Sequence, residues 1–235
     1  MNNAYKKFAY YYDDAISEID YDLWLEFIEL YLNKDSKILD LACGSGTLAI
    51  LLKLEGYNVS GLDLSESIIE IAKEKAKINH LNIPFYVDDM ANFNLNEKFD
   101  VITCFFDSIN FLQNEELVIK TFNCVKKHLN KGGIFICDVF SLDMLDEYLN
   151  NEIIKDFQTY KLVWKTKKVT DLCLVHNIEI YDKLDSVTLK ENYYEYYYDL
   201  EKLNIEGFSL IKKSGDFNDD YLEGDERLIF VYKIL

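Results

Sequence analysis

Three acidic positions carry the residues most suited to chemistry, and each follows a short apolar segment. They are Asp40, which precedes the turn Ala42-Cys43-Gly44-Ser45-Gly46, then Asp63, and then Asp89 with Met90 beside it. A carboxylate at Asp63 can accept hydrogen bonds from both hydroxyls of a ribose. The Asp89 carboxylate can accept a hydrogen bond from the amino group of an adenine while Met90 packs on the ring. Together these residues predict a site for an adenine nucleoside.

The turn after Asp40 fits two ligands. Gly44, Gly46 and Ala49 match the GxGxxG/A fingerprint of dinucleotide-binding proteins, so an NAD-dependent oxidoreductase is one reading. The negative charge of Asp40 would repel a pyrophosphate, however, and it suits a cationic ligand such as S-adenosylmethionine. We therefore favour the cationic nucleoside, and the acids at the next two positions support it.

The elements that position these residues alternate between strand and helix. Apolar strand candidates span 36–41, 57–62, 84–87, 99–105 and 134–140, and the last follows the Gly132-Gly133 pair. Helical spacing is found within residues 1–35, in the segment after residue 47, after Ser65, and over 117–129. Ser65 is the expected N-cap of its helix, with a capping box of Ser67 and Glu70 as the alternative. This rhythm predicts a parallel sheet covered by helices on both faces.

The rhythm changes after about residue 141. Residues 153–198 alternate as long strands without helices, and 208–213 and 227–234 are two further strand candidates that can pair as a hairpin. We expect three parts: a core with an N-terminal helical segment over 1–150, an antiparallel insertion over 151–198, and strands over 199–235 that complete the core sheet.

Composition limits the possible partners. The 235 residues carry a formal net charge of -17, which would repel nucleic acid and anionic membranes. This charge is explained by solubility alone or by a preference for amine substrates. The first residues contain no apolar segment of a secretory signal, and no apolar run reaches membrane-spanning length, so we expect a cytoplasmic protein. Five scattered cysteines and three separate histidines predict reduced thiols and no metal site.

Five segments in order resemble the successive motifs of class I S-adenosylmethionine-dependent methyltransferases. They are ILDLACGSGTLA, GLDLSESII, DDMANF, FDVITCFFDSINFL and LNKGGIFICDV, and the resemblance covers roughly residues 5–140. The start, FAYYYDDAISEIDYDLWLEFI, resembles a subgroup of bacterial small-molecule methyltransferases, largely uncharacterised, that is related to sugar-amine N,N-dimethyltransferases. The resemblance implies a Rossmann-like doubly wound α/β fold. Its seven-stranded sheet would have the order 3-2-1-4-5-7-6 with strand 7 antiparallel, and a β lid would follow strand 5.

The resemblance also implies a role for individual residues of the cofactor site. Asp40 and the turn from Ala42 to Gly46 would flank the methionyl part, Asp63 would hold the ribose, and Asp89 and Met90 the adenine. Further residues would surround the ligand: Leu64 beside the adenine, Cys104, Phe105 and Phe106 near the sulfonium, and Tyr12 and Trp24 as a cover. Many relatives carry glycine in place of Ala42.

The acceptor side is less well determined. Methyl transfer requires alignment and exclusion of water, and it requires a base only when the nucleophile is a hydroxyl or a carbon acid. His176 is the best-placed base by its position, although a satisfied buried histidine explains it better. Asp107 and Asn110 either orient an acceptor or make loop bonds. Tyr194 and Tyr196 belong to a tyrosine cluster that forms either an acceptor wall or a seam between strands.

Three functions therefore stay open. The first is S-adenosylmethionine-dependent methyl transfer to a small molecule, with an amine nitrogen as a candidate acceptor and S-adenosylhomocysteine as the product. The second is an NAD-dependent oxidoreductase, and the third a non-catalytic protein that binds S-adenosylmethionine. The sequence does not decide between a monomer and a homodimer.

Overall fold

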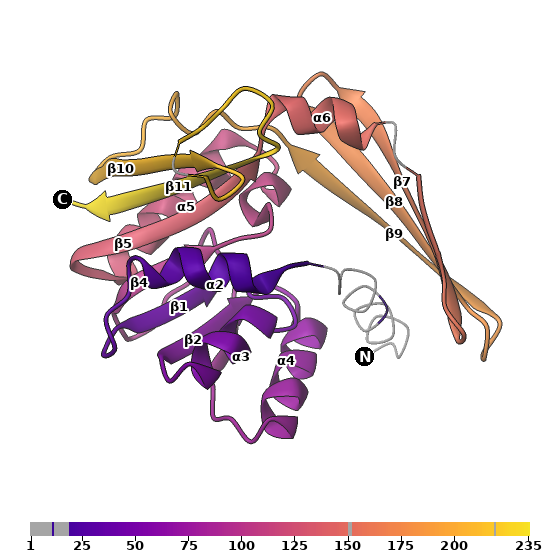
Figure 1. Cartoon of the computed structure of the whole chain (residues 1–235), viewed down its shortest axis with the longest axis horizontal. Coiled ribbons are helices and arrows are strands. Elements are labelled where there is room, and N and C mark those ends of the chain that lie inside the picture. The colour runs from indigo at the N-terminus through magenta and orange to yellow at the C-terminus, as the bar shows by residue number, and fades with distance from the viewer. Residues whose placement is uncertain (1–10, 12–18, 150–151, 219) are drawn as a thin grey trace.

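The structure contains two β-sheets, and the smaller one stands to one side of the larger, as Figure 1 shows. The computed structural model describes residues 11, 19–149, 152–218 and 220–235, and the predicted site residue Tyr12 lies outside them. One sheet has seven strands and the other has four. Within the described residues, no helix combines the length and the apolar composition that crossing a membrane requires.

The seven-stranded sheet has the order β10-β11-β5-β4-β1-β2-β3. Its strands are β1 (Lys37–Leu41), β2 (Asn58–Asp63), β3 (Phe85–Val87), β4 (Phe99–Cys104), β5 (Leu129–Phe140), β10 (Phe208–Gly215) and β11 (Arg227–Ile234). The five strands β1 to β5 run parallel to one another, whereas β11 pairs antiparallel with both β5 and β10. This order confirms the expected Rossmann-like sheet, including the hairpin that closes it.

Helices cover both faces of this sheet, as the alternation of strand and helix requires. The helices are α2 (Tyr21–Glu29), α3 (Thr47–Leu54), α4 (Glu66–Ile78) and α5 (Glu115–His128). One apolar core contains the buried residues of α5, and a second core on the opposite face contains those of α2, α3 and α4. Ser65 caps α4 by accepting a hydrogen bond from the Ile68 backbone at 3.4 Å, so the helix begins at the expected residue.

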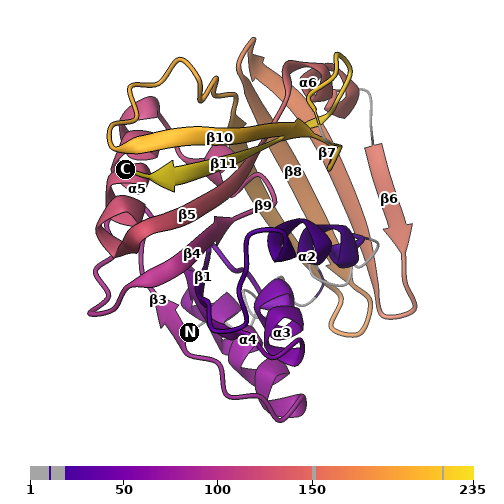
Figure 2. The ribbon, with the colours of Figure 1, turned by 60° about the vertical axis from the view of Figure 1, so that its left-hand side comes forward.

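The four-stranded sheet is antiparallel throughout and follows α6 (Leu142–Tyr148) in the chain. Its strands, which we call the lid sheet, are β6 (Glu152–Asp156), β7 (Tyr160–Thr170), β8 (Cys173–Asp182) and β9 (Val187–Tyr196). Figure 2 shows these long strands standing beside the core sheet rather than continuing it. Side chains alternate between two faces, so one face of the lid sheet is turned toward the core.

Two local expectations need correction. β5 begins at Leu129 and includes the Gly132-Gly133 pair, because Leu129 already pairs with Phe99. Gly132, with a positive φ of 76°, lies in the register irregularity before Ile134. The helical segment expected within residues 1–35 ends at Glu29, six residues short of the expected limit.

Candidate active site

A cavity of about 580 Å³ lies at the carboxyl ends of β1, β2, β3 and β4 and is closed on its far side by the lid sheet. Ligands of open α/β sheets bind at this edge, where successive strands deliver their loops. The predicted residues that line the cavity are Asp40, Ala42, Cys43, Gly44, Ser45, Asp63, Leu64, Asp89, Met90, Phe105, Phe106 and His176. The sequence therefore located the edge of the sheet at which the cavity lies.

The turn after β1 is built from left-handed backbone conformations. Ala42, Gly44 and Gly46 have φ values of 57°, 53° and 76°. Glycine adopts this region without cost, whereas Ala42 is a residue with a side chain held in it. A Cβ added at Gly44 would meet nothing within 4 Å, so this side of the turn faces open space. Gly46 does not line the cavity, because it packs against Ala72 and Phe85 as the N-cap of α3.

Asp63 ties two turns together at the end of β2. One carboxylate oxygen accepts a hydrogen bond from the Gly44 backbone at 3.0 Å, and the other accepts one from Ser65 at 2.9 Å. Burial raises the pKa of Asp63, while the N–H groups of Ser65, Gly44 and Leu64 oppose the shift. The carboxylate is thus held rigidly at the cavity wall with lone pairs left for a ligand.

Asp40 is the most deeply buried of the cavity acids. Its side chain accepts a hydrogen bond from the Thr103 hydroxyl at 3.0 Å. Burial raises the pKa of Asp40 to about 7, the Thr103 hydrogen bond opposes the shift, and the charge of Asp63 adds to it. Two buried acids near each other favour a cationic partner, since a positive charge would relieve both the burial and the repulsion.

The charges around the cavity support a cationic nucleoside. No lysine or arginine is among the described residues that line it. Lys75 lies behind the turn, where its amine donates to the hydroxyls of Ser45 and Thr47 at 3.0 and 2.7 Å. S-Adenosylmethionine fits this set, because its sulfonium and ammonium would meet the acids, whereas a pyrophosphate would be repelled.

Aromatic side chains after β4 form one wall of the cavity, but two residues predicted to contact the cofactor, Cys104 and Trp24, lie away from it. Phe105 and Phe106 line it, whereas Cys104 is fully buried in the core behind them. Trp24 packs its ring on both phenylalanines at centroid distances of 4.6 Å and is 4% exposed. Trp24 therefore supports this wall from behind instead of covering a ligand.

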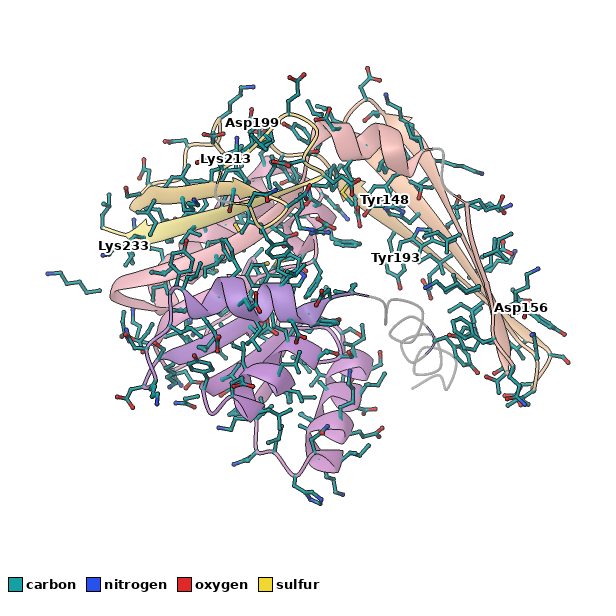
Figure 3. The ribbon with its side chains drawn as sticks, viewed as in Figure 1. Tyr148, Asp156, Tyr193, Asp199, Lys213 and Lys233 are labelled. Atoms are coloured by element: carbon teal, nitrogen blue, oxygen red, sulfur yellow. The ribbon has the colours of Figure 1, made fainter. Side chains whose placement is uncertain are left out.

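The lid sheet supplies the opposite wall through one face of each strand. Its lining residues are Trp164 on β7, His176 and Ile178 on β8, and Glu191, Tyr193 and Glu195 on β9. Figure 3 shows Tyr193 pointing from the lid sheet toward the core sheet. The proposed acceptor residues Tyr194 and Tyr196 do not line the cavity, because alternation on β9 turns them to the other face.

Asp107 and Asn110 are also absent from the cavity lining, because loop contacts hold them. Asn110 is fully buried, and its amide donates to the Tyr196 carbonyl at 2.8 Å, which joins the loop after β4 to the lid sheet. The Asp107 backbone N–H donates to Asp138 at 3.1 Å, and its carboxylate receives two hydrogen bonds from Arg227. Both side chains position the loop that carries Phe106.

Sequence reasoning missed the buried cluster of Asp107, Asp138 and Arg227. Arg227 donates to both aspartates and stacks over the Trp24 ring at 5.2 Å. Burial opposes the charge of Arg227, but the two aspartates outweigh it and raise the pKa of the guanidinium. For the Asp138 carboxyl, burial has the opposite effect and raises the pKa to about 7, although the charge of Arg227 opposes this shift. The three residues are distant in sequence, so no local sequence pattern predicts that they form a cluster.

Comparisons with known proteins agree with this fold and site. The family described as "Methyltransferase domain" matches residues 32–201. A relative from Geobacillus sp. (strain WCH70), which carries a methyltransferase name, is 31% identical over 98% of this chain and 99% of its own. The crystal structure of an S-adenosylmethionine-dependent methyltransferase from Clostridium acetobutylicum ATCC 824 has a TM-score of 0.84 and 30% identity, and the match covers 99% of each chain.

More distantly, 48% of this chain aligns with 27% identity to 44% of a dTDP-4-amino-2,3,4,6-tetradeoxy-D-glucose N,N-dimethyltransferase from Saccharopolyspora spinosa. The fold and the acidic cavity define a Rossmann-like enzyme that uses S-adenosylmethionine. The chain belongs to the methyltransferase domain family and is a class I S-adenosylmethionine-dependent methyltransferase. No support exists in these comparisons for the NAD-dependent alternative.

Proposed function

We propose that this enzyme transfers the methyl group of S-adenosylmethionine to the amine nitrogen of a small molecule. Asp40, Asp63 and Asp89 would hold the methyl donor at the strand ends, and the lid sheet, within residues 151–198, would hold the acceptor. The methyl donor supplies an activated carbon on a sulfonium, so the chain itself needs to align the acceptor and exclude water.

The observation that carries the choice of an amine is the charge of the acceptor wall. Glu191 and Glu195 face the cavity from β9, and the described lining residues contain no lysine or arginine to neutralise them. An acceptor that arrives as an ammonium would be attracted to this wall, while a carboxylate would be repelled. Aromatic side chains of the same wall, Tyr193 and Trp164, favour a cation as well.

The size of the site and a relative give further support. A cavity of about 580 Å³ lies within the size range of pockets that bind small molecules. The relative from Saccharopolyspora spinosa is named as an N,N-dimethyltransferase of an amino sugar, and it aligns with about half of this chain.

The test compares acceptors that differ only in the reacting group. The enzyme is incubated with S-adenosylmethionine and benzylamine, benzyl alcohol or benzoate, and also with a panel of amino sugars and their hydroxyl analogues. Mass spectrometry then measures S-adenosylhomocysteine and the methylated product. We expect N-methylated products from amines and none from the alcohols or acids. Methylation of only oxygen or carbon acceptors would refute the proposal.

A further inference from the structure

Four polar side chains form a connected cluster on the cavity face of the lid sheet. Trp164 and Thr166 come from β7, His176 from β8 and Glu195 from β9. The indole N–H of Trp164 and the hydroxyl of Thr166 each lie 2.9 Å from Nδ1 of His176. On the other side of the ring, Nε2 of His176 lies 3.2 Å from Oε2 of Glu195. The cluster therefore crosses three strands and ends at Glu195.

The indole of Trp164 decides which ring nitrogen of His176 carries the proton. An indole N–H donates and never accepts, so Nδ1 must accept and carries no proton. The neutral ring then holds its proton on Nε2, which faces Glu195. A second proton on Nδ1 would point at the Trp164 N–H. The proton of His176 is thereby placed on the side of the ring that faces Glu195, and the ring is a poor base for a substrate.

Glu195 is buried but incompletely partnered. It is 6% exposed and lines the cavity. Although Oε2 is near His176, the two groups are not aligned as a hydrogen bond, and Oε2 has no other hydrogen-bond partner among the described residues. A buried carboxylate oxygen in this state is unfavourable unless a donor reaches it. A ligand in the cavity can be that donor.

Three charged or titratable groups of the described residues act electrostatically on Glu195. They are His176 on β8, Asp107 in the loop after β4, and Arg227 on β11. Burial raises the pKa of Glu195, the contact with His176 opposes this shift, Asp107 adds to it, and Arg227 opposes it. Arg227 is engaged by Asp107 and Asp138, so it does not satisfy the free oxygen of Glu195.

We infer that Glu195 holds the ammonium of the acceptor and takes its proton, and that His176 is a positioning residue for Glu195. This inference rests on the proposed function, because it presumes an amine acceptor. The ammonium N–H bond breaks, its electron pair stays on nitrogen, and an O–H bond forms on Glu195. The neutral nitrogen can then form its bond to the methyl carbon as the carbon–sulfur bond breaks with its electron pair on sulfur. The proton leaves Glu195 to water when the product departs.

This arrangement gives a specificity rule. An ammonium donates a charge-assisted hydrogen bond to Glu195, whereas an alcohol of the same shape donates a weaker one and brings no charge. The glutamate therefore selects amines over alcohols when both fit the aromatic part of the wall.

Binding measurements test the rule without turnover. The protein saturated with S-adenosylhomocysteine is titrated calorimetrically at pH 7 with benzylamine, ethylamine, a 4-amino sugar, and benzyl alcohol. We expect wild type to bind at least one amine and to bind benzyl alcohol about tenfold more weakly or not at all. Glu195→Gln, which keeps the shape and removes the charge, should weaken amine binding about tenfold or more. Equal binding of amine by wild type and Glu195→Gln, or binding of no amine by wild type, would overturn the assignment.

Matched variants separate a local role from a loss of structure. Glu179→Gln removes the same charge from the exposed face of β8 and should leave amine binding unchanged. His176→Gln retains an N–H donor for Glu195 and should preserve the amine preference, whereas His176→Leu should lose it. Affinity for S-adenosylhomocysteine and the thermal unfolding midpoint, measured for each variant, identify any that fail to fold. Loss of the preference in both His176 variants would refute the positioning role.

The pH profile separates this inference from the proposed function. In wild type, kcat/KM for the amine should reach a plateau above the pKa of Glu195, since the enzyme accepts the ammonium form. In Glu195→Gln, only the free amine can react, so kcat/KM should rise about tenfold per pH unit below the pKa of the amine. N-methylation with identical profiles in both proteins refutes the role of Glu195 and leaves the proposed function intact. Absence of N-methylation by wild type refutes the proposed function itself.

Discussion

Arg227 donates through both terminal nitrogens to the two carboxylate oxygens of Asp107, at 2.8 and 3.1 Å. Asp107 and its neighbour Phe106 have left-handed φ values of 59° and 60°, which are unfavourable for residues other than glycine. The ion pair therefore holds a strained loop, and through it the Phe106 side chain that lines the cavity.

Replacing Arg227 should destabilise the protein strongly. Arg227→Met leaves Asp107 and Asp138 buried near each other without their cation, and breaking a buried pair costs about 3–5 kcal/mol. Urea unfolding should report a loss of that size. Lys233→Met removes an exposed cation from the same strand and should change the free energy of unfolding by less than about 0.5 kcal/mol. Similar values for the two variants would show that the cluster contributes little.

Asp40 should make the protein without ligand less stable as the pH rises. Its pKa is about 7 when folded and 3.8 ordinarily, so between these values the folded state binds more protons than the unfolded state. The associated stability is fully present below about pH 4 and is lost as the pH rises through about 7. Asp40→Asn removes this loss. We expect the variant at pH 8 to gain about 1 kcal/mol or more, which corresponds to about 2–4 °C in Tm.

Thermal unfolding of both proteins from pH 5 to pH 8 tests this expectation. The wild-type Tm should fall more steeply than that of the variant, although Asp63, Asp138 and Glu195 also have raised pKa values and retain part of the slope. Asp35→Asn, at an exposed position before β1, should follow the wild type. Parallel curves for wild type and Asp40→Asn would contradict the argument.

Patterns with short periods made the core sheet predictable. Strand and helix alternate, the first three strands each deliver an acid to one edge, and the tight turn after Asp40 uses small residues, so the cavity edge followed from local sequence. The acceptor wall did not follow in the same way. Tyrosines occupy both faces at the end of β9, so their polarity does not distinguish inside from outside. The prediction of Tyr194 and Tyr196 as acceptor residues is therefore wrong, and Tyr193 lines the cavity instead.

Glu195 shows why the remaining site residues escaped prediction. In the sequence it is a charged residue among tyrosines, and charged residues are usually exposed. It is buried only because the lid sheet turns that face of β9 toward the core, where His176 approaches it from β8. Strand alternation places residues 191, 193 and 195 on one face of β9, which groups the lining residues correctly. Alternation alone does not say whether that face is turned toward the core or toward solvent.

Gly61 should be intolerant of even one added methyl group. A Cβ there would lie 2.6 Å from the Phe85 ring and 2.8 Å from Sγ of Cys43, in the layer directly beneath the cofactor turn. Overpacking of this kind costs about 1–3 kcal/mol, so Gly61→Ala should lower the free energy of unfolding by that amount. The double variant Gly61→Ala/Phe85→Leu provides room and should recover part of the loss. If the second substitution only adds to the loss, then crowding against Phe85 is not the cause.

Asp63→Asn should weaken S-adenosylmethionine binding more than it weakens the fold. The asparagine retains one oxygen for the N–H of Gly44 or Ser65, but it loses the charge and one acceptor at the cavity wall. We expect an affinity loss of about tenfold to a hundredfold with a change in unfolding free energy of about 1 kcal/mol. Asp88→Asn provides the comparison, because Asp88 hydrogen-bonds within its own loop to Asp89 and Asn94. Equal affinities in Asp63→Asn and wild type would remove Asp63 from the binding site.

Binding of S-adenosylmethionine should release protons near neutral pH. A positive ligand next to Asp40 stabilises its charged form, so the pKa of Asp40 falls from about 7 and a partly protonated carboxyl loses its proton. The release should be about half a proton at pH 7 and should vanish above about pH 8.5, where Asp40 is already ionised. Calorimetric titrations in phosphate and in Tris measure this number, because the two buffers differ in ionisation enthalpy. Asp40→Asn should abolish most of the buffer dependence, while Glu195→Gln tests whether the acceptor wall contributes to it. Heats at pH 7 that are the same in both buffers for wild type would mean that the cation does not settle against Asp40.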